Sequence, residues 1–248
     1  HRMPAGRHRA AFFVTEPPCP MSPPRIKDPH AVPVAGHDHH LEPVDPARLT
    51  PPALRRQFQE ARGFEAPIRG DGAAGAPRAP AQAAVLVGLV AREQGLQVLL
   101  TRRTDHLRDH AGQISFPGGR SEPEDGSPEA TALREAQEEV GLPPACVEVL
   151  GRLPDYTTVT QFVVTPVVGL VHPPFELTLD AFEVAEAFEV PLAFLMTPAH
   201  HRRHVFQFEG GQRQFLSMPW RQADAAHEYF IWGATAAMLR NLYHFLRH

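Results

Sequence analysis

Residues 127–141 carry the signals of one short helix that begins and ends at defined positions. Ser127 is a residue type that caps helix N-termini, and Pro128 suits the first helical turn. Gly141 is typical of the position just after a helix, and Pro143 prevents the helix from continuing. We therefore expect a helix over 127–140, and its composition constrains the chain more than any other stretch.

Three carboxylates gather on one face of this helix. At about 100° per residue, Glu135, Glu138 and Glu139 fall within an arc of roughly 100°, opposite an apolar face. Such close like charges destabilise a helix, and a hard divalent cation with oxygen ligands would remove the repulsion. Arg134 can pair with one carboxylate and fix its orientation. An ordinary solvated helix face with charged residues is the competing interpretation.

The segment before the helix adds glycines and arginines. Gly118 and Gly119 allow the backbone to approach a ligand or metal closely. Upstream, Arg102, Arg103 and Arg108 are suited to bind phosphate oxygens, with a surface salt bridge as the alternative for each. Carboxylates, glycines and arginines together favour metal-assisted attack on a phosphoanhydride.

Composition excludes several classes of protein. The net charge is −4 over 248 residues, which argues against nucleic acid as a partner. No run of 18 or more apolar residues exists, which argues against a membrane span. The two cysteines, Cys19 and Cys146, lie far apart and suggest no disulfide framework. We expect a cytoplasmic protein.

The chain divides into three parts. Residues 1–47 are rich in Pro and His and are expected to be a disordered extension, in which 37–40 (HDHH) is a solvated tail and not a metal site. Residues 48–81 are expected to hold a short helix, capped by Thr50, and a linker. Residues 82–248 form the main domain.

The domain is expected to be of the α/β class, with three layers. Strands are expected at 83–90, 96–102, 147–153, 162–171, 205–208 and 214–218, and helices at 127–140, 181–190 and 229–246.

The stretch 116–142 resembles the Nudix box, written G-x5-E-x7-R-E-U-x-E-E-x-G-U with U aliphatic. Residues 134–142 (REAQEEVGL) match its second half, with Ala at one aliphatic position. The first half departs by one residue in its spacing, and Asp125 takes the place of the first acidic residue.

The segment 99–119 is similar to a motif of the coenzyme A pyrophosphatase branch of that family, L-L-T-x-R-[SA]-x3-R-x3-G-x3-F-P-G-G. It reads LLTRRT at 99–104, followed by Arg108, Gly112 and FPGG at 116–119, and Thr104 is the one mismatch. A weaker similarity extends through 183–186 and 231–235.

The resemblance implies a Nudix-like α/β/α sandwich with a mixed central sheet. It also implies hydrolysis of a nucleoside diphosphate derivative with Mg²⁺ or Mn²⁺. Glu135 and Glu139 would be the main metal ligands, and Glu138 a further ligand in the catalytic set.

The resemblance does not single out one residue as the general base. The candidates are Glu135, oriented by Arg134, and Glu186 or Glu183 from the later helix. The branch resemblance implies coenzyme A or its thioesters as substrate. Its phosphates would be held by Arg102, Arg103, Arg108, Gly118 and Gly119, whereas His106 and His110 are interpreted as ordinary loop residues.

Two alternatives remain. One is a Nudix enzyme for other substrates such as ADP-ribose or NADH. The other is an inactive Nudix-fold binding module, which the presence of all three glutamates disfavours. The expected partner is a small-molecule substrate, with no nucleic acid and no membrane, and a homodimer is left open.

Overall fold

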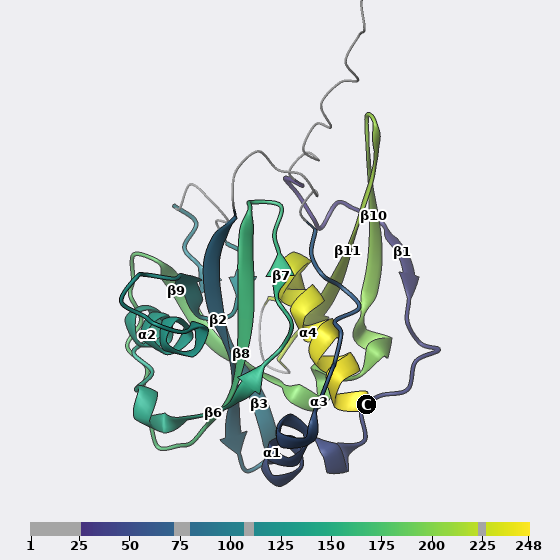
Figure 1. Cartoon of the computed structure of the whole chain (residues 1–248). Helices are drawn as coiled ribbons and strands as arrows, with labels where there is room; N and C mark the ends of the chain where they lie inside the picture. The colour runs from purple at the N-terminus through teal and green to yellow at the C-terminus, as the bar shows by residue number, and fades with distance from the viewer. Residues whose placement is uncertain (1–25, 72–79, 107–111, 223–226) are drawn as a thin grey trace, which may run out of the picture.

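The computed structural model describes residues 26–71, 80–106, 112–222 and 227–248. Two sheets and four α-helices make up the described part (Figure 1). The larger sheet holds β2 (Ala81–Arg92), β3 (Gly95–Arg103), β4 (Ile114–Ser115), β5 (Gly118–Arg120), β6 (Val147–Arg152), β7 (Tyr156–Thr157), β8 (Phe162–Val171) and β9 (Val184–Pro191). The smaller sheet has the order β1 (Val34–His37), β10 (Arg202–Phe208), β11 (Gly211–Trp220) and β12 (Tyr229–Trp232). The helices are α1 (Pro51–Glu60), α2 (Pro128–Val140), α3 (Leu192–Leu195) and α4 (Gly233–Arg247), with 3-10 turns at Pro46–Arg48, Pro144–Cys146 and Pro198–His200.

The larger sheet is mixed and buried on both faces. Strand β2 runs parallel to β8 and antiparallel to β3. Alternate residues of β2 enter two separate cores, because successive side chains of a strand point to opposite faces: Ala84, Leu86 and Val90 pack with α2, whereas Ala83, Val87 and Leu89 pack with α4 and the smaller sheet. Figure 1 shows α2 and α4 on opposite sides of the sheet. The expected α/β/α sandwich with a mixed central sheet is confirmed.

Local signals located several elements correctly. The two expected hairpins are β2–β3 and β10–β11, and the strand at 162–171 is β8. Helix α1 follows Thr50, although the Thr50 side chain makes no capping hydrogen bond.

The helix expected at 181–190 is wrong. This stretch forms β9, which pairs antiparallel with β3 from Gln97↔Pro191 to Arg103↔Val184. Its apolar spacing is compatible with a helix, but β3 has an edge whose backbone groups need partners, and pairing with β9 satisfies them.

The helix expected at 229–246 begins too early. Residues 229–232 form β12, which pairs with the end of β11 through Ser217↔Trp232 and Trp220↔Tyr229. Gly233 has a φ of 63° and marks the change from strand to helix α4. No helix of the described residues has the length and apolar character needed to cross a membrane.

The described part of the expected disordered extension is ordered, which corrects that expectation for residues 26–47. Strand β1 pairs with β10, and Asp38 is buried. The described part of the expected linker is also tied to the domain, since Gly70 bridges Thr157 and Asn241 bonds the backbone of Ile68. Tertiary contacts thus order segments whose composition favours disorder.

Candidate functional site

The glutamate helix α2 begins and ends as the sequence indicates. The Ser127 hydroxyl accepts the backbone N–H of Ala130 at 3.2 Å, and Gly141 takes the left-handed conformation with a φ of 69°. The apolar side of α2 packs on the larger sheet through Ala132, Ala136 and Val140. This packing sets the position of the three glutamates relative to the larger sheet.

Glu139 lies deepest of the three glutamates. It is 5% exposed, and its Oε2 accepts the Gly118 backbone N–H at 3.2 Å. Burial raises the Glu139 pKa to about 7, against the opposing effects of the Gly118 hydrogen bond and the Arg103 charge. The positive charge near Glu139 therefore does not offset the cost of burying its carboxylate.

Glu135 rests directly on Gly119. A Cβ at position 119 would stand 2.5 Å from the Glu135 Oε2, so any larger residue there would displace this carboxylate. Burial raises the pKa of Glu135, whereas the guanidinium of Arg134, whose Nη2 lies 2.9 Å from its Oε1, acts in the opposite direction. The pairing of β5 with β2 holds Gly119 in this position.

Arg134 joins the acidic residues of the box. It donates to Asp125 from Nε at 2.8 Å, to Glu138 from Nη1 at 3.0 Å and to the Arg120 carbonyl from Nη2 at 3.1 Å. These bonds hold the pKa of Asp125 far below its usual range, with the Arg134 hydrogen bond as the main cause. Asp125 therefore orients Arg134, while Glu138 stands at the surface with 61% of its side chain exposed.

Arg103 connects this cluster to a second acidic residue. Its Nη1 lies 3.6 Å from Glu139 Oε1, and its Nη2 lies 3.5 Å from Glu183 Oε2. The charge of Glu183 contributes to the raised pKa of both Glu135 and Glu139. Glu183 thus belongs to the same electrostatic group as Glu135 and Glu139.

Glu186 lies in a different environment. It pairs with Arg102 at 3.4 Å and accepts the hydroxyl proton of Tyr229 in a short hydrogen bond. Burial, followed by this bond, raises the Tyr229 pKa to about 12. Glu186 lies on strand β9 and not on the expected helix, and its contacts are with Arg102 and Tyr229 and not with the glutamates of α2.

Tyr229 was not found by the sequence reasoning, because residues 229–232 were assigned to a helix. The signal that was available is the run of aromatic and β-branched residues YFIW, which is typical of a strand, followed by a glycine.

A large cleft opens beside these groups. It has a volume of about 800 Å³ and is lined by Arg102, Arg103 and Gly118 from the motif, together with apolar residues such as Phe116, Trp232 and Met238. A cleft of this size suits a ligand as large as a nucleotide derivative. Arg108 and His110 lie outside the described residues, and the ring of His106 is 5.0 Å from that of the exposed Phe182.

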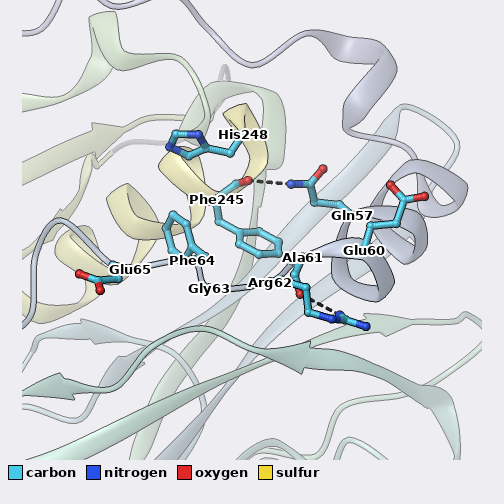
Figure 2. A pocket seen from close by; sticks show the side chains of 9 residues that line it. All are labelled: Gln57, Glu60, Ala61, Arg62, Gly63, Phe64, Glu65, Phe245 and His248. Carbon is cyan, nitrogen blue, oxygen red and sulfur yellow. Dashed lines mark hydrogen bonds between the residues drawn. The ribbon is translucent and has the colours of Figure 1, made fainter.

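A second hollow lies elsewhere, between the ends of α1 and α4 (Figure 2). It measures about 470 Å³ and is lined by Gln57, Glu60, Ala61, Arg62, Gly63, Phe64, Glu65, Phe245 and His248. Gln57 donates to the Phe245 carbonyl at 3.0 Å, and Arg62 folds back on the Ala61 carbonyl at 2.9 Å. This hollow shares no residue with the glutamate helix or the large cleft.

The glutamates have the donor chemistry for a hard cation. As the side chains stand, no three His, Cys, Asp or Glu residues of the described ranges come together closely enough to hold a metal ion. Positive charge near Glu135 and Glu139 comes from Arg134 and Arg103, yet burial keeps both carboxyl pKa values raised. Oxygen donors with uncompensated charge fit Mg²⁺ or Mn²⁺.

Comparisons with known proteins agree with this arrangement. A family model described as NUDIX domain matches residues 80–207. A Salmonella paratyphi B protein described as uncharacterized Nudix hydrolase NudL is 48% identical over 163 residues, which are 65% of this chain and 80% of that protein. The Escherichia coli protein of the same description is 45% identical with the same coverage.

Solved structures were matched as well. The MutT protein from Methanosarcina mazei is 25% identical, with a TM-score of 0.38, over 48% of this chain and 87% of that protein.

Proposed function

The chain belongs to the Nudix hydrolase family, whose members act on pyrophosphate bonds, and on that basis we propose that it hydrolyses the pyrophosphate of coenzyme A or an acyl-coenzyme A. Water attacks one phosphorus atom, the bridging P–O bond breaks, and the attacking water loses its proton. The products are adenosine 3′,5′-bisphosphate and 4′-phosphopantetheine or its acyl form.

One observation carries this proposal: the buried Glu139 and the half-buried Glu135 lie beside a cleft that the coenzyme A motif itself lines. Residues 99–103 end strand β3 with Arg102 and Arg103, and 116–119 bring Gly118 to the wall of the same cleft. Glu139 accepts the N–H of that glycine, so the carboxylates and the cleft share one backbone segment. A pyrophosphate held by the arginines would lie within reach of the glutamates.

The residues of the chain have separable tasks in this proposal. Glu135 and Glu139 would hold the metal ion, which when bound neutralises the pyrophosphate and lowers the pKa of the attacking water. Arg134, itself held by Asp125, fixes the orientation of Glu135. Glu135 and Glu183 are the candidates to accept the proton. Glu183 is favoured over Glu186 because Arg103 bridges Glu183 and Glu139, and because the charge of Glu183 acts on both Glu135 and Glu139.

The substrate is tested by incubating the purified chain with Mn²⁺ or Mg²⁺ and, in parallel, coenzyme A, acetyl-coenzyme A, ADP-ribose and NADH, with products identified by mass spectrometry. We expect 4′-phosphopantetheine or its acetyl form from the first two. Cleavage of ADP-ribose or NADH with coenzyme A untouched would show that the enzyme acts on other nucleoside diphosphate derivatives.

The glutamate assignment is tested by Glu139→Gln, which keeps the size of the side chain and removes the charge. We expect the kcat to fall by at least about 100-fold, while the circular dichroism spectrum and the melting temperature stay close to those of the unchanged chain. Glu209→Gln, an exposed glutamate beside the β10–β11 turn, is the matched control and should retain full activity. Full activity of Glu139→Gln would overturn the assignment.

A further inference from the structure

The large cleft has a second polar region beyond the segments that carry the motifs. Besides Arg102 and Arg103, its wall includes Arg213 of β11, Asp71 and the turn residues 158–160. Arg213 lies past residue 207, where the NUDIX match ends. Neither motif covers these residues, and the proposed cleavage of the pyrophosphate assigns no role to them.

An ion pair holds Arg213 in place, but not all of its N–H groups have hydrogen-bond partners. Its Nη2 forms a short ion pair with Asp71 Oδ2, and Asp71 Oδ1 accepts the Val159 N–H at 2.9 Å. The Arg213 Nε is buried and has no hydrogen-bond partner among the described residues. A buried donor without a partner is unfavourable, so an anion that binds the exposed part of this half-buried guanidinium would stabilise it.

The backbone around Arg213 is fixed before any ligand arrives. Gly70 packs on the Thr157 backbone so closely that a Cβ there would stand 2.2 Å from the Thr157 carbonyl oxygen. The hydroxyls of Thr158 and Thr160 lie 3.0 Å apart, and both residues line the cleft. Gln161, which closes this turn, has a φ of 63°, a conformation that non-glycine residues adopt rarely. A rarely adopted backbone conformation next to hydroxyl groups on a cleft wall is typical of a binding site.

The charge balance in this region favours an anion. Three carboxylates line the cleft, and two of them are engaged within the protein: Asp71 as described, and Asp28 through the N–H groups of His30 at 3.0 Å and Ala31 at 3.3 Å. The third, Glu228, is exposed, and the four cationic side chains of the wall, which are Lys27, Arg102, Arg103 and Arg213, outnumber the carboxylates. The ammonium of Lys27 also lines the cleft and has no ion-pair partner in the ranges that the structure describes. The donors in excess therefore belong to Arg213 and Lys27.

We propose that Arg213, assisted by Lys27, binds a second phosphate of the substrate, a phosphate monoester separate from the pyrophosphate. The proposal rests on the function given above, because coenzyme A carries such a group on its ribose, whereas ADP-ribose and NADH do not. Arg213 would then distinguish the substrate, and Arg102 and Arg103 would bind the reacting pyrophosphate. The competing explanation is that Arg213 only clamps Asp71 and residue 70 onto the sheet.

The test compares coenzyme A with dephospho-coenzyme A, which differs only by the missing 3′-phosphate. We expect Arg213→Gln to lower kcat/KM for coenzyme A on the order of 10- to 100-fold and to change kcat/KM for dephospho-coenzyme A by less than about twofold. Arg69→Gln is the matched control, because Arg69 forms an exposed ion pair with Glu65 and does not line the cleft. An equal loss for both substrates would mean a structural clamp, and no change for either would mean no contact; both outcomes overturn the proposal.

A binding measurement without turnover separates this proposal from the proposed function. Calorimetry with adenosine 3′,5′-bisphosphate and adenosine 5′-monophosphate should give tighter binding of the bisphosphate, and Arg213→Gln should abolish the difference. Equal affinity for the two nucleotides in the unchanged chain refutes the second phosphate site, even if coenzyme A is cleaved. A preference for the bisphosphate with no cleavage of coenzyme A supports the site and refutes the proposed reaction.

Discussion

Neighbouring residues of the glutamate helix have different environments although they share one face. The Glu138 side chain is 61% exposed and pairs with Arg134, whereas the Glu139 side chain is 7% exposed. The helical period places both on one arc, so it predicts the cluster but not the burial. Burial depends on where β5 lies against α2, and that placement determines which carboxyl pKa is raised.

Gly119 offers a direct test at the residue scale. Gly119→Ala would place a Cβ 2.5 Å from the Glu135 Oε2, so the carboxylate has to move. We expect kcat to fall by at least about 10-fold with little change in the melting temperature, because a small displacement of a catalytic group lowers the rate strongly.

Gly211→Ala is the control for this substitution. Its Cβ would make only an ordinary 3.5 Å contact with the Phe208 ring, so its kinetics should match those of the unchanged chain. Equal kcat values for Gly119→Ala and Gly211→Ala would argue against the role of Gly119.

At the scale of elements, strand β9 decides which acidic residue joins the glutamates. As a helix, 181–190 would place Glu183 and Glu186 on one face. In the structure Glu186 lies in β9 and pairs with Arg102, whereas Glu183 lies just before the strand and pairs with Arg103, with a register shift of β3 between the two arginines. The sequence named both residues, and strand pairing separated them.

Because Glu183 and Glu186 have different partners, we expect different kinetics when each is replaced by glutamine. Glu183→Gln should lower kcat by about 10-fold or more, because it removes a charge from the group around Glu139. Glu186→Gln keeps a partner for Tyr229 and should alter KM more than kcat, because Arg102 lines the cleft. Steady-state kinetics of the two variants, side by side, measure this, and the opposite order would restore Glu186 as the base.

At the scale of the whole molecule, the N-terminal segment is part of the folded domain. Asp38 is 3% exposed and pairs with Arg203 at 3.2 Å and with Arg240 of α4 at 3.0 Å. Arg240 also donates to His201, whose pKa burial lowers to about 4. These contacts join β1, β10 and α4, and residues 26–30 of the same segment reach the wall of the cleft.

Removing the Asp38 charge should therefore destabilise the entire domain. Asp38→Asn leaves Arg240, which is 8% exposed, without its carboxylate, and we expect a loss of roughly 3–5 kcal/mol in the free energy of unfolding. Urea unfolding of the full chain measures this. Glu42→Gln, an exposed position four residues later, should stay within about 0.5 kcal/mol, and equal stability of both variants would contradict a buried network.

The sequence by itself determined what is local: the helix from Ser127 to Gly141, both hairpins, and the glycines and glutamates of the box. Capping, period and turn residues act within a few positions, so the sequence contains their physics directly. The tertiary structure alone decided that 184–191 and 229–232 are strands, that Asp38 is buried, and that Glu139 bonds Gly118 at the wall of the cleft that Arg213 also lines. These outcomes depend on which backbone edges and charges meet across long separations, and those meetings exist only when the chain is folded.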